Sequence, residues 1–111
     1  MNGELIFLVQ GNAPNPFRVC FRREGEGLSA TCTCNAGALG KLCKHRLGLM
    51  KGDPFGLVGG SSAQVALIQE LFQGTAGEPA LKDLLDAEGA LLQAEALFTL
   101  KKTAFQSVVK L

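Results

Sequence analysis

Two neighbouring segments of the chain alternate between apolar and polar residues. In the segment 17–23, FRVCFRR, the apolar Phe17, Val19 and Phe21 alternate with Arg18, Cys20 and Arg22, and the segment 28–34 continues the alternation after a short glycine-containing turn. A period of two residues is typical of strands with one buried face, so these segments predict an antiparallel hairpin. The apolar run over 5–10 predicts a further, buried strand.

The rest of the chain shows the three-to-four-residue spacing of helices. Helices are predicted over 43–52, over 62–72 with Ser62 as the cap, and over 80–109. The glycine-rich stretches 35–40 and 56–62 are interpreted as a loop and a flexible connector. Apolar side chains recur every seven residues in the last helix, at Leu84, Leu91, Phe98 and Phe105.

The charge of the chain is small overall but unevenly distributed. With 11 Lys and Arg against 10 Asp and Glu, the formal net charge is +1, which gives no whole-chain attraction to nucleic acid or anionic lipid. Residues 1–61 hold 7 basic and 4 acidic residues, whereas residues 62–111 hold 4 basic and 6 acidic ones. The chain has no Trp and no Tyr, so any base stacking depends on Phe, His or Arg.

Composition also bears on the compartment. The chain is 47% apolar, which suits a globular core, but no apolar run approaches the ~20 residues that a membrane span requires. The N-terminal MNGELIFLVQG lacks the basic start, long apolar stretch and cleavage site of a secretory signal. We therefore expect a cytoplasmic protein without membrane contact, where closely spaced cysteines bind metals rather than form disulfides.

Three of the four cysteines and the only histidine are clustered. Cys32, Cys34, Cys43 and His45 follow the pattern C-x-C-x8-C-x-H. Three thiolates and one imidazole form a closed tetrahedral set for Zn²⁺, which is typical of structural rather than catalytic sites. The alternative, core thiols and a histidine without a metal, is disfavoured by the clustering. Cys20 lies on the polar face of a predicted strand and is interpreted as a half-buried thiol rather than a ligand or nucleophile.

The motif CTCNAGALGKLCKH, with the preceding hairpin FRVCFRR…LSATCTC and the following HRLGLM, resembles the SWIM zinc finger. The resemblance covers about half of the chain, roughly Leu5 to Gly52. The chain as a whole is similar to small prokaryotic members that combine a finger with a helical tail. The family is described in chromatin-remodelling ATPases, Mutator-type transposases and recombination factors, with proposed roles in binding DNA and other proteins. By position, the resemblance implies that one structural Zn²⁺ is bound by Cys32, Cys34, Cys43 and His45.

These features together predict an α+β fold. A short antiparallel hairpin or three-stranded sheet would carry a zinc knuckle and a short helix, followed by a helical hairpin. The predicted organisation is a SWIM-like finger over 1–52, a linker over 53–61 and a helical region over 62–111 that is a candidate dimerisation element.

The first functional hypothesis is a non-enzymatic nucleic-acid-binding or adaptor protein. Basic side chains near the predicted site suit non-specific contact with DNA or RNA phosphates, which weakens with salt. The basic residues concerned are Arg22, Arg23, Lys41, Lys44 and Arg46. No carboxylate pair, Ser-His-Asp set or phosphate loop indicates an enzyme or a small-molecule substrate.

The alternative hypothesis is a pure protein-interaction module that acts through its helical tail. An apolar stripe over three to four heptads could pack on its own finger, on the 62–72 helix, on a partner or on a second copy as a homodimer. The stripe residues concerned are Leu84, Leu91, Phe98 and Phe105.

Overall fold

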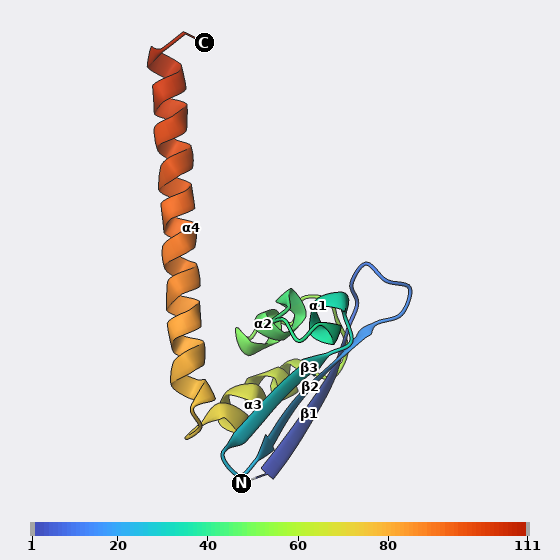
Figure 1. Ribbon diagram of the computed structural model, residues 1–111. Helices are drawn as coiled ribbons and strands as arrows, with labels where there is room; N and C mark the ends of the chain where they lie inside the picture. The colour runs from blue at the N-terminus through green and yellow to red at the C-terminus, as the bar shows by residue number, and fades with distance from the viewer. Residues whose placement is uncertain (1, 111) are drawn as a thin grey trace. The chain divides into compact units, whose positions relative to one another are not determined.

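The computed structural model describes residues 2–110, and its central element is a four-stranded antiparallel sheet in the order β3-β2-β1-β4 (Figure 1). The strands are β1 (Asn2–Val9), β2 (Phe17–Glu24), β3 (Gly27–Cys32) and β4 (Leu57–Gly59). The helices are α1 (Asn35–Ala38), α2 (Lys44–Met50), α3 (Ser62–Phe72) and α4 (Gly77–Val108). The predicted α+β class is confirmed.

The predicted hairpin forms between β2 and β3, and β1 pairs with the other edge of β2. The register of β1 and β2 runs from Val9 opposite Phe17 to Asn2 opposite Glu24. In the tight turn between β2 and β3, Gly25 has a φ of 61°, a left-handed conformation that glycine adopts without steric cost. The alternation of apolar residues therefore predicted both the strands and their buried face.

The helices α2 and α3 pack on one face of the sheet and enclose the core (Figure 1). Phe7, Val19, Phe21 and Ile68 are the largest side chains with less than 2% exposure. The ring of Phe21 makes edge-to-face contacts with Phe7 at 6.1 Å and with Phe72 at 6.4 Å between centroids. Such aromatic pairs add stabilisation beyond the apolar area that they bury. The core thus depends on α3 as well as on the strands.

The stretch expected to be a flexible connector instead contains β4, which pairs with β1. The backbone N–H of Gln10 donates to the carbonyl of Gly56 at 2.7 Å. At Gly59, a Cβ would lie 2.8 Å from Cβ of Leu8, so the absence of a side chain allows the two strands to approach. A three-residue strand flanked by glycines has no detectable alternation, and β4 was therefore not predicted. With β4 the sheet has four strands rather than the expected two or three.

The chain divides into two compact units, residues 1–78 and 79–111, and α3 lies in the first. The cap of α3 is Ser61, one residue before the expected Ser62, and it forms a capping box with Gln64. The segment predicted as a helix over 80–109 is one continuous helix, α4, with Pro79 in its first turn. The predicted helical hairpin concerns the placement of α4 relative to α3 and stays a prediction. Among residues 2–110, no helix is long and apolar enough to cross a bilayer.

Candidate metal centre

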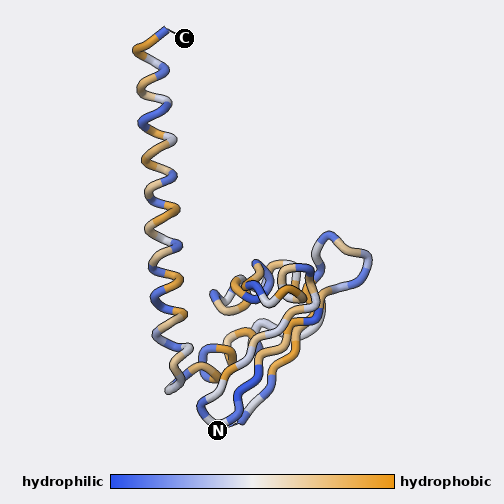
Figure 2. Tube along the Cα trace, viewed as in Figure 1, coloured by the Kyte–Doolittle hydropathy of each residue, from blue (hydrophilic) through white to orange (hydrophobic). Residues whose placement is uncertain are grey.

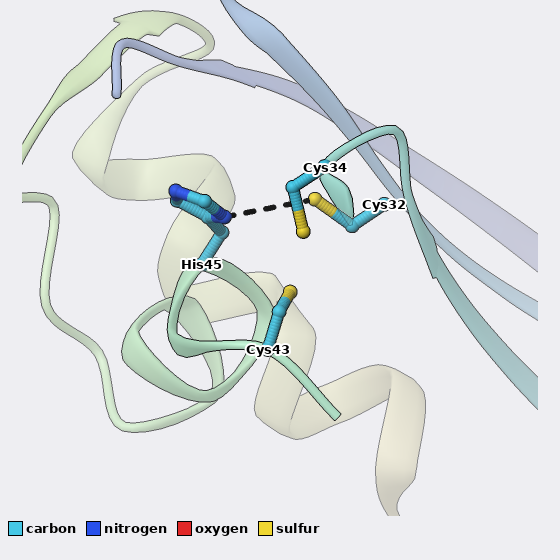
Figure 3. Close-up of side chains that lie close together, drawn as sticks. All are labelled: Cys32, Cys34, Cys43 and His45. Atoms are coloured by element: carbon cyan, nitrogen blue, oxygen red, sulfur yellow. Dashed lines mark hydrogen bonds between the residues drawn. The ribbon is translucent and has the colours of Figure 1, made fainter. Parts of the chain in front are cut away.

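The four predicted ligands converge where β3 meets the first turns of two short helices (Figure 3). Cys32 ends β3, Cys34 is the N-cap of α1, Cys43 is the N-cap of α2, and His45 lies in the first turn of α2. Their ligand atoms all lie within 4.8 Å of one another, and the three cysteines are buried. The sequence prediction that these residues come together is confirmed.

Local hydrogen bonds orient two of the thiols. The sulfur of Cys34 accepts from the backbone N–H of Gly37 at 3.3 Å, which forms the one-turn helix α1 where the sequence predicted only a loop. The sulfur of Cys43 accepts from the backbone N–H of Arg46 at 3.4 Å and from its Nε at 3.3 Å. A side chain that caps a helix has a fixed direction, and here both caps aim sulfur into the site.

The donor set fits a zinc ion. A tetrahedral site with Zn–S bonds of about 2.3 Å and Zn–N bonds of about 2.1 Å places a sulfur about 3.6 Å from the nitrogen and about 3.8 Å from another sulfur. Sγ of Cys32 lies 3.8 Å from Nδ1 of His45, and the largest separation in the cluster is 4.8 Å. Because four protein ligands are enough to fill the tetrahedral coordination of zinc, the Cys3His site fits one structural Zn²⁺ and would keep no position open for a substrate.

The imidazole of His45 is held in place by its surroundings. Its ring lies against Phe17 at 4.8 Å between centroids, and Nε2 faces the backbone near Gly11, where a Cβ would lie 3.3 Å away. Burial, followed by the charge of Lys44, lowers the pKa of His45. The neutral imidazole is the form that binds a metal.

Protein groups alone also separate the pKa values of two thiols. Burial is the main cause that raises the pKa of Cys32 to about 12. Burial acts in the same direction on Cys43, but hydrogen bonds from the backbone and side chain of Arg46, and from Cys34 and Cys32, outweigh it and lower the pKa of Cys43 to about 7. The fold therefore favours ionisation of Cys43 over that of Cys32.

Two of the five basic residues assigned to phosphate contact have a different position. Arg23 is 9% exposed and donates through its guanidinium to the carbonyls of Leu71, Gln73 and Gly25. Arg46 is 8% exposed. The guanidinium of Arg46 also donates to two carbonyls, those of Ala30 and Lys41. Both cations are occupied by backbone acceptors inside the fold, so the expectation that they face a phosphate backbone is corrected.

The other three basic residues are exposed. Arg22 pairs with Glu24 on the outer face of the sheet, whereas Lys41 and Lys44 flank Cys43. Arg18 is also exposed, and its backbone bonds to Thr33, which lies between the ligands Cys32 and Cys34. The four stripe residues of α4 are exposed as well: Leu84, Leu91, Phe98 and Phe105.

A pocket and an exposed aromatic side chain were not predicted. The pocket has a volume of about 510 Å³ and is lined by residues that include His45, Lys44, Asn12 and Phe55. Phe55 is 87% exposed, although phenylalanine is usually buried. One feature of the sequence indicates its exposure: Phe55 follows Asp53-Pro54 in a turn and belongs to no apolar periodicity.

Comparison with known proteins identifies the finger. The family model described as SWIM zinc finger matches residues 7–51, which include all four ligands. No curated protein and no solved structure matches the chain. The match and the geometry of the Cys3His cluster agree, and the chain therefore carries a SWIM zinc finger over residues 7–51, with Cys32, Cys34, Cys43 and His45 positioned to bind zinc.

Proposed function

We propose that this protein is a non-enzymatic module that binds single-stranded nucleic acid through the zinc end of its finger. The observation that carries the proposal is the grouping of exposed cations with an exposed aromatic ring beside the Cys3His cluster. Lys44 and Phe55 line the same pocket, next to the ligand His45. Lys41 is exposed two residues before Cys43, and Arg18 is exposed on β2, where its backbone bonds to Thr33 between Cys32 and Cys34.

Each of these groups suits one part of a nucleic acid strand. Exposed lysine and arginine side chains attract phosphates without reading sequence. An exposed aromatic ring offers a stacking surface that accepts any base, with a contribution of about 1–3 kcal/mol per base. A pocket of about 510 Å³ is in the size range of sites that accept small ligands such as a base. The combination favours a single strand, whose bases are free to stack.

The role of zinc in this function is structural. When bound, the ion joins the end of β3 to α2, because its ligands come from both, and it holds Lys41 and Lys44 near the strand that carries Arg18. We further propose a cytoplasmic location, where thiols stay reduced and available to a metal.

Fluorescence anisotropy with labelled oligothymidine and with a labelled duplex tests the proposal at several salt concentrations. Lys44→Ala is expected to weaken binding to every oligonucleotide and to lower the slope of log K against log salt by about 0.7 for single strands. Phe55→Ala is expected to weaken single-strand binding about tenfold and to affect the duplex less. Absence of binding at about 50 mM salt would overturn the proposal.

Two matched variants control for general effects. Lys82→Ala removes the same charge from α4, where Lys82 pairs with Asp86. Leu39→Ala removes an apolar side chain that is 72% exposed but has no aromatic ring. Both are expected to bind oligonucleotides like the unaltered protein. If Leu39→Ala weakens binding as much as Phe55→Ala, stacking is not the cause.

A further inference from the structure

Among the residues that the structure describes, α4 carries a heptad stripe of exposed apolar side chains, interrupted at Lys101, that no neighbour within its own compact unit covers. Its heptads place one set of residues at 84, 91, 98 and 105 and a second set at 87, 94, 101 and 108, the a and d positions of a coiled coil. Leu97 and Ala90 widen this face at the adjoining g positions. Phe98 is 67% exposed, and Figure 2 shows hydrophobic residues recurring along the whole helix. Such a face is typical of a helix that pairs with another.

The length of α4 exceeds what the rest of the chain can cover. A helix of 32 residues is about 48 Å long at 1.5 Å per residue. A compact unit of the size of residues 1–78 has a radius of gyration of about 11–12 Å, which corresponds to a diameter of about 30 Å. Packing on the finger would therefore leave about a third of the apolar face in water, and an isolated helix gains little stability by itself.

The charges of α4 indicate what covers this face. Residues 77–95 contain five acidic residues and one lysine, whereas residues 96–110 contain three lysines and no acidic residue. Two such helices in parallel would bring like charges together over both halves, with Lys101 facing its own copy at a d position. Two antiparallel helices would place the acidic half of each beside the basic half of the other.

We propose that α4 pairs antiparallel with α4 of a second copy of this chain. In the register that pairs every a position with a d position, residues whose numbers sum to 192 lie opposite each other, which gives the four distinct pairs 84/108, 87/105, 91/101 and 94/98. Each large side chain at 98 and 105 then meets an alanine of the second copy, at 94 and 87 respectively. This alternation of large and small residues allows close packing of two helices.

The same register explains two further positions. Val108 lies opposite Leu84 of the second copy, which closes the apolar face at both ends. The two-fold axis passes the level of residue 96, and the two copies of Leu97 lie one residue to either side of it on the same edge of the pair, because g positions flank each other in antiparallel helices. The dimer carries one finger at each end of the paired helices, and this inference does not depend on whether the fingers bind nucleic acid.

Light scattering of the full chain at micromolar concentration tests the association. The chain is expected to be a dimer, and Phe98→Glu is expected to raise the dissociation constant about a hundredfold or more. Ala96→Glu is the matched control, since position 96 lies on the opposite face and the change should leave the dimer intact. Zinc content and circular dichroism show that both variants are folded. A monomeric unaltered chain, or equal loss in both variants, would overturn the proposal.

Disulfide trapping tests the orientation in a Cys20→Ser chain whose remaining cysteines are the zinc ligands. Leu97→Cys is expected to form an intermolecular disulfide on mild oxidation, since the two copies of this position meet only in the antiparallel pair. Leu84→Cys is expected to stay reduced, because two copies of an a position meet only in a parallel pair. The reverse result would overturn the antiparallel arrangement. Full zinc content in the oxidised sample shows that the ligands are not involved.

Discussion

Replacement of Arg46 by alanine separates a structural role from a nucleic-acid-binding one. The guanidinium bonds the carbonyl of Ala30 at 2.7 Å, the carbonyl of Lys41 and the sulfur of Cys43 at 3.3 Å. It therefore joins three segments: β3, the stretch before α2 and the N-cap of α2. Arg46→Ala removes all three bonds and leaves two carbonyls and a sulfur without these donors.

The expected loss of stability follows from the bonds removed. A hydrogen bond from a charged donor contributes about 1.5–3 kcal/mol when it is buried. The bonds to Ala30 and Lys41 are only partly buried, so water replaces part of what is lost. Arg46→Ala is therefore expected to lower the free energy of unfolding by about 3 kcal/mol. Groups that orient a metal ligand typically affect metal affinity by about 10–100-fold, and we expect a decrease of that size here.

Urea denaturation at fixed free zinc measures the first quantity, and competition with a chromogenic chelator measures the second. Lys44→Ala is the matched control, since Lys44 is an exposed cation on the same helix and its loss should change stability by less than about 0.5 kcal/mol. An Arg46→Ala variant that retains its stability and zinc affinity but loses oligonucleotide binding would contradict the structural role of Arg46. That result would return Arg46 to the phosphate-contacting set that the sequence suggested.

Three further predictions concern the site and the remaining thiol. Purified protein should contain about one zinc per chain by metal analysis. The Cys34→Ser variant should lack zinc, whereas Cys20→Ser should retain it. Zinc retained in Cys34→Ser would contradict the ligand assignment. Gly37→Ala should destabilise the finger by about 2 kcal/mol or more in urea, because the new Cβ would clash with the backbone oxygen of Cys32. Gly48→Ala, with open space around it, should instead stabilise α2 by about 0.5–1 kcal/mol. Equal effects of the two substitutions would show that crowding is not the cause. Burial and then the charge of Glu4 raise the pKa of Cys20, so less thiolate is present at neutral pH. Alkylation of Cys20 by iodoacetamide should therefore be slow, and it should be faster at higher pH and in Glu4→Gln. An unchanged alkylation rate in Glu4→Gln would exclude the carboxylate as a cause.

The parts of the site that depend on short sequence separation could be predicted. The spacing of Cys32, Cys34, Cys43 and His45 predicted the ligand set, and the alternation over 17–23 predicted the strand that supports it. In both cases the relevant contacts lie within a few residues or across one tight turn. Local periodicity and ligand chemistry therefore sufficed.

The features that could not be predicted depend on contacts between distant segments. Arg23 donates to the carbonyl of Leu71, which lies 48 residues further along the chain, and a charged residue in an alternating strand is ordinarily solvated. Position 23 is nevertheless on the inward face, in step with Val19 and Phe21. The periodicity was thus correct, and the expectation from the charge of the side chain was not. Pairing of β4 with β1 is distant in the same sense and has no local signal.

The position of Arg23 also explains why the folded unit is longer than the segment that matches the family. The matched segment ends at residue 51, but the compact unit extends to residue 78. Without α3, the ring of Phe21 would lose its contact with Phe72, and the guanidinium of Arg23 would lose two of its three carbonyl acceptors. A buried cation without such acceptors is costly, so residues 17–24 would no longer have a stable inward face. Bound zinc would hold the end of this sheet that carries Cys32, and α3 covers its inward face through Phe72 and Arg23, so the finger and α3 belong to one compact unit.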